Sequence, residues 1–272
     1  MKIANKLRSV LRRFNGTQLN LKYAMSGGHA SSNKRTALRS ALLWLCKSQD
    51  VTQCGGFSRA FSLIEGWGPP YPETTGYISQ TFLDCADQFT DMDLADRARR
   101  ALDWLADVQF ESGAICRLMY SPSNTHPSVF NTGMVLHGWV GLSERETNEK
   151  VFKAAERAVN WLVAEQEEQG YWLRNAYNNI PHAYYTMVDW ALLRYFKLSG
   201  DEKAKRVALR HLEWTLRNQR DNGWIEHSAF TARDLPLTHN LSYTTQGLVE
   251  SGKILGQERF VAAAKKATLP LL

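Results

Sequence analysis

A tryptophan–glutamine pair recurs four times along the chain, and this repeat constrains the fold more than any other feature of the sequence. Trp44, Trp104, Trp161 and Trp214 are each followed five residues later by a glutamine, and successive tryptophans are 60, 57 and 53 residues apart. In the last three units a glycine stands four residues after the glutamine. Repeats of this kind are typical of a structure that stacks copies of one supersecondary unit.

Each unit contains two segments with helical character. The first is amphipathic and ends near the Trp–Gln pair, over residues 35–48, 93–107, 149–165 and 201–218. The second is more apolar all round, as expected of a helix with little exposed face, over residues 74–89, 131–144, 184–198 and 243–256. A Thr or Asn near the start of each second segment can cap the helix. A fifth amphipathic segment covers 258–269. We therefore predict an all-α fold, a single α/α toroid of about four to five helical hairpins with outer and inner helices.

Basic residues are concentrated at the start of the chain. Residues 1–34 contain seven basic and no acidic groups, whereas the remainder contains 26 basic and 27 acidic groups. This contrast divides the chain into a basic N-terminal arm, 1–34, and a toroid domain, 35–272. The nearly neutral body argues against nucleic-acid binding. Residues 1–14 are expected either to dock on the toroid and close the ring or to contact an anionic membrane, because one helical face carries Ile3, Leu7, Val10, Leu11 and Phe14.

Several classes of protein are excluded by simple patterns. No run of 18 apolar residues exists, and the first residues lack the apolar core of a secretory signal. The four cysteines form no C-x-x-C pair, which predicts neither a zinc site nor a disulfide framework. We therefore expect a cytoplasmic protein without metal or cofactor, associated with the membrane only if the arm binds lipid.

Two motifs resemble known proteins. The units Trp104-Leu105…Gln109…Gly113 and Trp161-Leu162…Gln166…Gly170 resemble the QW-type repeats of α/α-toroid proteins, which include terpene cyclases and prenyltransferase β-subunits. The toroid architecture is shared by many glycan-processing enzymes. The chain lacks the D-x-D-D motif of the cyclases and any suggestive Cys–His pairing for the prenyltransferase zinc site. Residues 66–77, GWGPPYPETTGY, resemble a segment of toroid proteins encoded with bacterial exopolysaccharide and O-antigen assembly.

The loops from outer to inner helices gather at one end of a toroid, which makes that end the expected pocket. Four residues after each loop glycine stand Arg59, Arg117, Arg174 and His227. At equivalent repeat positions these groups would form a cationic rim that binds carboxylates or phosphates. The alternative is that they are solvated loop charges or bond the ends of inner helices.

Residues near the starts of the inner helices can carry proton transfer. Glu73 is a candidate general acid or base, or else a favourable charge at a helix N-terminus, and Asn131 is a ligand contact or a cap. Two further clusters, around His182 and His239, each combine His, Tyr and Asn. His and Tyr can exchange protons, and Asn can hold a carboxylate. The predicted catalytic residues are thus Glu73, His182, Tyr184 and Tyr243. The predicted substrate-binding residues are Arg59, Trp67, Arg117, Asn131, Trp172, Arg174, His227, His239 and Asn240, with Trp67 or Trp172 as a stacking platform for a sugar.

These residues favour an enzyme of bacterial surface-polysaccharide production that acts on an acidic, uronate-containing oligosaccharide or polysaccharide. Lyase, epimerase and hydrolase chemistry all stay open, and the first two share abstraction of the proton next to the uronate carboxylate. One alternative is a non-catalytic toroid that binds a glycan or a lipid-linked intermediate, or that serves as a scaffold. Another is an isoprenoid-binding protein, which predicts a pocket of Phe and Trp without a charged ring.

Overall fold

The computed structural model describes residues 33–268, and nine α-helices make up most of this part of the chain. The outer helices are α2 (Lys34–Asp50), α4 (Leu94–Asp107), α6 (Glu149–Glu165), α8 (Glu202–Arg217) and α10 (Glu258–Thr268). The inner helices are α3 (Pro72–Cys85), α5 (Val129–Ser143), α7 (Thr186–Ser199) and α9 (Thr238–Leu255). The predicted all-α architecture and the alternation of outer and inner helices are confirmed.

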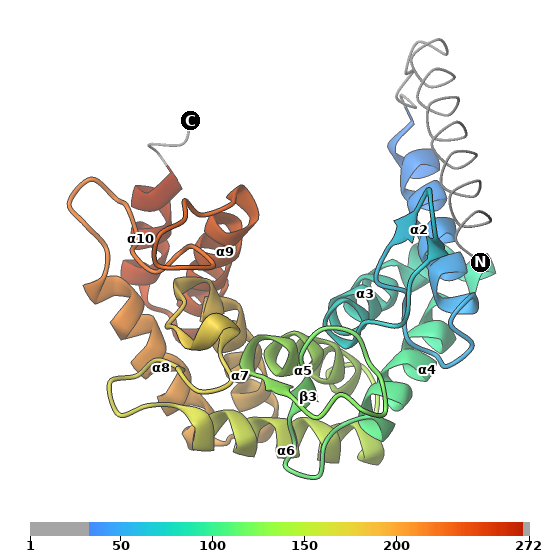
Figure 1. The fold of residues 1–272 in the computed structure, drawn as a ribbon, viewed down its shortest axis with the longest axis horizontal. Coiled ribbons are helices and arrows are strands. Elements are labelled where there is room, and N and C mark those ends of the chain that lie inside the picture. The colour runs from blue at the N-terminus through green and yellow to red at the C-terminus, as the bar shows by residue number, and fades with distance from the viewer. Residues whose placement is uncertain (1–32, 269–272) are drawn as a thin grey trace, which may run out of the picture.

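The helices form an open arc with the inner helices on its concave side (Figure 1). The inner helices pack in chain order, α3 against α5, α5 against α7, and α7 against α9. The helices at the described ends of the arc, α2 and α10, lie apart from each other (Figure 1). The amphipathic stripe predicted within residues 1–14, and with it the ring closure or membrane contact, lies outside the described residues.

The loops add only small elements of other structure. The strands β1 (Phe61–Ser62) and β2 (Gly66–Trp67) form one antiparallel hairpin, with Phe61 opposite Trp67. The strands β3 (Ile115–Cys116) and β4 (Pro127–Ser128) form another, with Ile115 opposite Ser128. Four 3₁₀ turns complete the described part: η1 (Ala86–Gln88), η2 (Thr90–Met92), η3 (Tyr177–Asn179) and η4 (Ala183–Tyr185).

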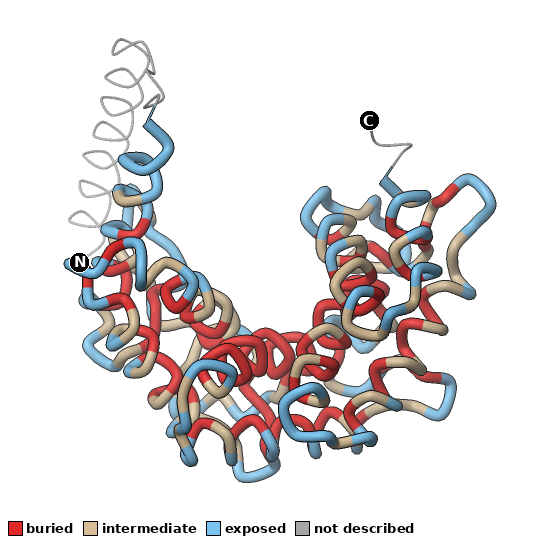
Figure 2. The backbone as a smooth tube through the Cα atoms, turned by 180° about the vertical axis from the view of Figure 1, so that it is seen from behind, coloured by how far each residue is buried: buried red, intermediate tan, exposed pale blue. Residues whose placement is uncertain are grey.

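Burial separates the two layers of helices. Every residue of α5 except the last is buried, which agrees with its apolar sequence, whereas α4 buries only the stripe that faces the inner layer. The buried positions concentrate along the inner layer of the arc (Figure 2). No helix within residues 33–268 is both long and apolar enough to cross a membrane.

The repeated glutamine joins each unit to the next. Its side-chain Nε2 donates to the carbonyl of the loop glycine in its own unit and to a backbone carbonyl of the following outer helix. For Gln109 these acceptors are Gly113 at 2.8 Å and Ala154 of α6 at 2.9 Å. The same pair of bonds recurs at the other three units, with donor–acceptor distances of 2.8 to 3.1 Å, at Gln49, Gln166 and Gln219.

The loop glycine is required by both backbone conformation and space. Gly113 has a φ of +96°, and a Cβ built there would lie 2.2 Å from the Arg157 carbonyl oxygen of α6. The equivalent loop glycines Gly55, Gly170 and Gly223 also have positive φ and lie against the next outer helix. Each loop therefore passes too close to the next unit for any side chain.

The repeated tryptophans hold equivalent positions but not equal environments. Trp104, Trp161 and Trp214 are 7 to 8% exposed, whereas Trp44 is 50% exposed. Trp104 packs directly over Gly56 in the loop of the preceding unit. No unit precedes Trp44 within the described residues, so its ring instead contacts Phe61 and Trp67.

The expected threonine and asparagine caps are not where the inner helices begin. Each of these helices except α7 starts two or more residues before the predicted segment, and Ser128 is the N-cap of α5. Thr75 and Thr132 lie one turn further in, where their hydroxyls accept the N–H groups of Phe57 and Ile115 from the loops. These threonines therefore hold the loops against the inner helices.

Replacing Gln109 by alanine removes both bonds of one glutamine clamp and leaves two carbonyls without that donor. We expect Gln109→Ala to lower the free energy of unfolding by about 2–3 kcal/mol, as measured by urea denaturation. The exposed Gln169 provides a matched control, because Gln169→Ala removes an amide that makes no clamp. Equal effects of the two substitutions would contradict the role of the clamp.

Alanine at a loop glycine tests the close approach between units. Gly113→Ala and Gly200→Ala both place a side chain at positive φ, but nothing lies within 4 Å of a Cβ at Gly200. We expect about 1 kcal/mol of destabilisation at Gly200 from backbone strain alone and clearly more at Gly113. Thermal denaturation of the two variants measures the difference, and similar melting temperatures would rule out the steric role.

Candidate functional site

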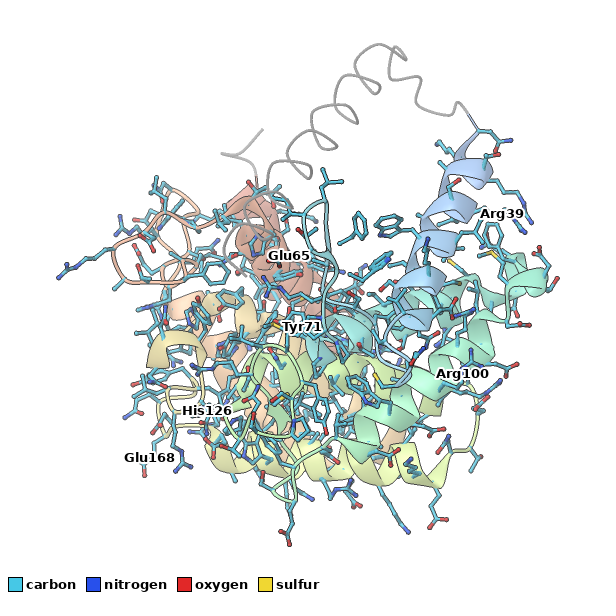
Figure 3. The ribbon with its side chains drawn as sticks, turned by 45° about the vertical axis from the view of Figure 1, so that its right-hand side comes forward. Arg39, Glu65, Tyr71, Arg100, His126 and Glu168 are labelled. Carbon is cyan, nitrogen blue, oxygen red and sulfur yellow. The ribbon has the colours of Figure 1, made fainter. Side chains whose placement is uncertain are left out.

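A cavity of about 220 Å³ lies at the end of the arc where the outer-to-inner loops and the inner-helix N-termini meet. Residues from all four inner-helix entries and from their loops line it. They are Tyr71, Glu73, Arg117, Leu118, Ser128, Phe130, Asn131, Tyr177, Tyr184, Phe230, His239, Asn240 and Tyr243. Tyr71 lies within the body of the arc, while Arg39, Arg100 and Glu168 lie toward its periphery (Figure 3).

The only carboxylate that lines this described cavity belongs to Glu73, in the first turn of α3. Pro72 is the first residue of the helix, and Tyr71 before it is the N-cap residue with an extended backbone. The Tyr71 hydroxyl donates a hydrogen bond to Glu73 Oε2. Desolvation raises the pKa of Glu73 above its ordinary value, and the bond from Tyr71 opposes part of that rise. The site thus holds a carboxyl group that binds a proton more tightly than an exposed glutamate does.

One cation shares the cavity with Glu73. Arg117 follows β3, and its Nη2 donates to the Ala176 carbonyl at 3.0 Å. A guanidinium group carries five N–H donors, so this anchor leaves others for a ligand. Asn131 is fixed nearby, since its Nδ2 donates to the Cys116 carbonyl at 2.8 Å. A positive group and a proton-transfer group are therefore combined in one small space.

Aromatic rings form the remaining wall. Phe130 stacks on Tyr185 and meets Tyr184 edge to face, with ring centroids 5.5 and 5.3 Å apart. Tyr243 of α9 packs against Phe130, and its side chain interacts with that of Tyr77 of α3 on the other arm of the arc. Burial and the charge of Glu73 raise the pKa of Tyr243. The Tyr243 phenol therefore holds its proton more tightly than an exposed tyrosine does.

Seven of the predicted site residues meet at this cavity. They are Glu73, Arg117, Asn131, Tyr184, His239, Asn240 and Tyr243. Of the four members of the predicted cationic rim, only Arg117 lines the cavity itself. Arg174 forms an ion pair with Glu165 at 2.7 Å, and Arg59 donates to the sulfur of Met119 at 3.3 Å. His227, at a φ of +60°, packs on Trp214 instead.

Three other predicted residues also do not line the cavity. The two ring nitrogens of His182 face the Tyr177 and Ala229 carbonyls at 2.7 and 3.1 Å, and burial lowers its pKa to about 4. Trp172 is fully buried and donates to the Leu162 carbonyl. Trp67 packs with Phe61 on the β1–β2 hairpin. Neither tryptophan presents a ring to a ligand in the cavity.

Other lining residues were missed by the sequence reasoning. Tyr71 stands two residues before Glu73, inside the segment 66–77. Its position next to the start of a helix is the sequence signal that could have identified it as a site residue. Tyr177 and Phe230 come from long loops without a repeated pattern, and no sequence signal indicated them. No tryptophan lines the described cavity, and both the Glu73 carboxyl and the Arg117 guanidinium do. A lining of this kind disfavours the isoprenoid-binding alternative.

No group of three or more His, Cys, Asp or Glu side chains suited to a metal ion occurs within residues 33–268.

Comparisons with solved structures place the fold among α/α-toroid enzymes. An unsaturated glucuronyl hydrolase specific for heparin matches with a TM-score of 0.63 and 15% identity, over 85% of this chain and 64% of that one. A sugar epimerase from a ruminal bacterium matches with a TM-score of 0.62 and 9% identity, over 80% and 64%. The α-mannanase BT2949 of Bacteroides thetaiotaomicron, of family GH76, matches with 0.56 and 13%, over 73% and 57%.

These likenesses establish the predicted toroid fold and nothing finer, because the identities are low. The chain spans less than two thirds of each of these three structures. No protein-family model and no curated protein matches the sequence.

Because the pKa of Glu73 is raised, we predict that its carboxyl group destabilises the folded protein as the pH rises. The folded state holds the proton more tightly than the unfolded chain, so the wild type loses stability relative to Glu73→Gln as pH rises from about 4.5 to the raised pKa. The loss is at most about 1.4 kcal/mol per pH unit. Urea denaturation of both proteins between pH 4 and 8 measures it. A difference that is constant, or that shifts the other way, would contradict the desolvation of Glu73.

Proposed function

We propose that this protein is a glycan-processing enzyme that binds one acidic sugar unit in the cavity and transfers a proton at the carbon next to the sugar carboxylate. The observation that carries the proposal is that Glu73 and Arg117 both line a cavity of about 220 Å³. This volume is below the roughly 300–1,000 Å³ of cavities for drug-sized ligands, so it suits a single sugar ring.

Arg117 is the group proposed to hold the carboxylate of the sugar. Its guanidinium can form two parallel hydrogen bonds to a carboxylate, which a lysine cannot. When the proton leaves the neighbouring carbon, negative charge spreads into that carboxylate. A fixed cation stabilises the developing charge and so lowers the barrier.

Glu73 is the proposed base. Its ionised carboxylate takes the proton from C5 of a uronate, and its raised pKa makes it a stronger base than an exposed glutamate. Tyr71 positions the carboxylate through its hydrogen bond. The electron pair of the broken C–H bond then belongs to the uronate, which can go on in two ways.

In β-elimination the electron pair forms the C4–C5 double bond, the C4–O bond breaks, and the leaving oxygen takes a proton from Tyr243. In C5 epimerisation Tyr243 returns a proton to the opposite face of C5. In both cases exchange with water restores Glu73 and Tyr243. Hydrolysis by a pair of carboxylates is less well supported, because Glu73 is alone among carboxylates in the described lining.

The source of the glycan is a further part of the proposal. The resemblance of residues 66–77 to a segment of toroid proteins encoded with exopolysaccharide and O-antigen assembly supports a bacterial surface polysaccharide as the substrate. Tyr71 and Glu73 both belong to this segment.

Proton exchange at C5 tests elimination and epimerisation together. We expect uronate-containing oligosaccharides incubated with the protein in D₂O to lose the C5 proton, either as an unsaturated product or as a deuterated uronate detected by NMR. Glu73→Gln is expected to slow this exchange by about 10²–10⁴-fold. Glu65→Gln, on the exposed β1–β2 hairpin, is the matched control and should keep the wild-type rate.

Binding distinguishes the enzyme from a non-catalytic glycan-binding toroid. We expect Arg117→Ala to weaken binding of a uronate oligosaccharide by about tenfold to a hundredfold in calorimetry, with little effect on a neutral one. Arg100→Ala on the outer surface is the control. Tight uronate binding that depends on Arg117 without any exchange at C5 would favour the binding protein, and equal affinity for acidic and neutral sugars would overturn both.

A further inference from the structure

The guanidinium of Arg117 is anchored on a turn with an unusual backbone, residues 175–179, called here the anchor turn. Arg117 Nη2 donates to the Ala176 carbonyl of this turn at 3.0 Å, and among the described residues no other hydrogen bond holds the guanidinium. Asn175, Asn178 and Asn179 all have φ between +52° and +59°. Three left-handed residues in a segment of five cost conformational free energy, so the turn keeps this shape only where its surroundings fix it.

His182 is a buried side chain that contacts the anchor turn. The residue is 1% exposed, its Nε2 lies 2.7 Å from the Tyr177 carbonyl oxygen, and its Nδ1 lies 3.1 Å from the Ala229 carbonyl oxygen. Burial lowers the pKa of His182 to about 4, so the ring is neutral at neutral pH and carries one N–H. We assign that hydrogen to Nε2, because the contact with Tyr177 is the shorter one. The ring thus donates to the carbonyl next to the one that binds Arg117.

Further buried contacts connect the anchor turn and His182 to the helices. The Tyr185 hydroxyl accepts a hydrogen bond from the Tyr177 N–H at 2.9 Å. His211 of α8 has its Nε2 3.2 Å from the His182 carbonyl oxygen and its Nδ1 2.6 Å from Asp189 Oδ2 of α7. Tyr185, His211 and Asp189 are fully buried. The turn that holds Arg117 is therefore fixed through side chains that a ligand in the cavity does not touch.

We propose that His182 is a positioning residue for Arg117: by donating to the Tyr177 carbonyl, it fixes the turn whose Ala176 carbonyl anchors the guanidinium. This inference rests on the proposed function, in which Arg117 binds the sugar carboxylate. His182 itself does not line the cavity. A guanidinium binds a carboxylate through two parallel hydrogen bonds only in one relative orientation, so a displaced anchor weakens that pair. The role of His182 is therefore to maintain the preference of the site for an acidic sugar over a neutral one.

The test compares the affinities for methyl glucuronide and for its neutral counterpart, methyl glucoside, measured by NMR titration or calorimetry. We expect wild type to prefer the glucuronide by about tenfold to a hundredfold. His182→Ala is expected to reduce this preference by about three- to tenfold, because the guanidinium loses its fixed position. The affinity for methyl glucoside should change little.

A double-mutant cycle shows whether the effect passes through Arg117. In an Arg117→Ala background, His182→Ala should leave the affinity for methyl glucuronide unchanged, because the group that it positions is gone. A merely structural role of His182 would weaken the binding of both sugars, and the loss would persist in this background.

His137 of α5 provides a matched control for the loss of a buried imidazole. It is 4% exposed, its Nε2 lies 2.8 Å from the Met187 carbonyl oxygen, and it does not line the cavity. His137→Ala should keep the wild-type preference for the glucuronide. If His182→Ala does not fold, Tyr185→Phe takes its place, because it removes another bond to the anchor turn and should reduce the preference in the same way.

The outcomes are distinct. An unchanged preference in His182→Ala, or in Tyr185→Phe where the alanine variant does not fold, overturns the role of His182 while uronate binding stands. An equal loss in His137→Ala, or a loss of glucuronide affinity that persists in the Arg117→Ala background, overturns it as well. Wild type that binds the two sugars with equal affinity overturns the proposed function, and the inference with it.

Discussion

Each repeat is tied to the next by one glutamine amide, whose Nε2 spans the loop glycine and a backbone carbonyl of the following outer helix. The position of each loop against the next unit depends on this contact. Both N–H groups of the amide are used, so the loop cannot move away from the next unit without losing a buried hydrogen bond. The glycine then has to lie against the backbone of that helix, where no side chain fits. Repeated four times, the same contact brings every loop to the same end of the arc.

The cavity is a consequence of that convergence. Four inner helices begin at one end of the arc, and the side chains near their starts carry different functional groups. They are a carboxyl from α3, an amide from α5, and an amide and a phenol from α9. Helix N-termini favour a negative charge, yet desolvation raises the pKa of Glu73. Burial therefore outweighs the hydrogen bond from Tyr71 at this position. The fold therefore gives up some stability to hold a carboxyl group that is more basic than an exposed one. This is the usual condition of an acid–base residue.

The toroid fold supports several reactions on sugars, so the likeness to a glucuronyl hydrolase, an epimerase and a mannanase leaves the chemistry of this chain open. The proposed chemistry rests instead on which side chains share the cavity. A single carboxyl and a guanidinium that line the same cavity suit proton removal next to a sugar carboxylate.

The sequence by itself determined the helices, their alternation and the toroid, because apolar periodicity and the Trp–Gln spacing act along a continuous stretch of chain. It also indicated Glu73 and the Asn and Tyr residues near the inner-helix starts. The tertiary structure alone decided which of them meet. Arg117 and Arg174 hold the same offset from their glycines, but Arg174 forms an ion pair with Glu165 and only Arg117 lines the cavity. His182 and Tyr184 are two residues apart, yet only Tyr184 lines the cavity. In irregular loops the direction of a side chain is set by partners from other units, and no local pattern records those partners.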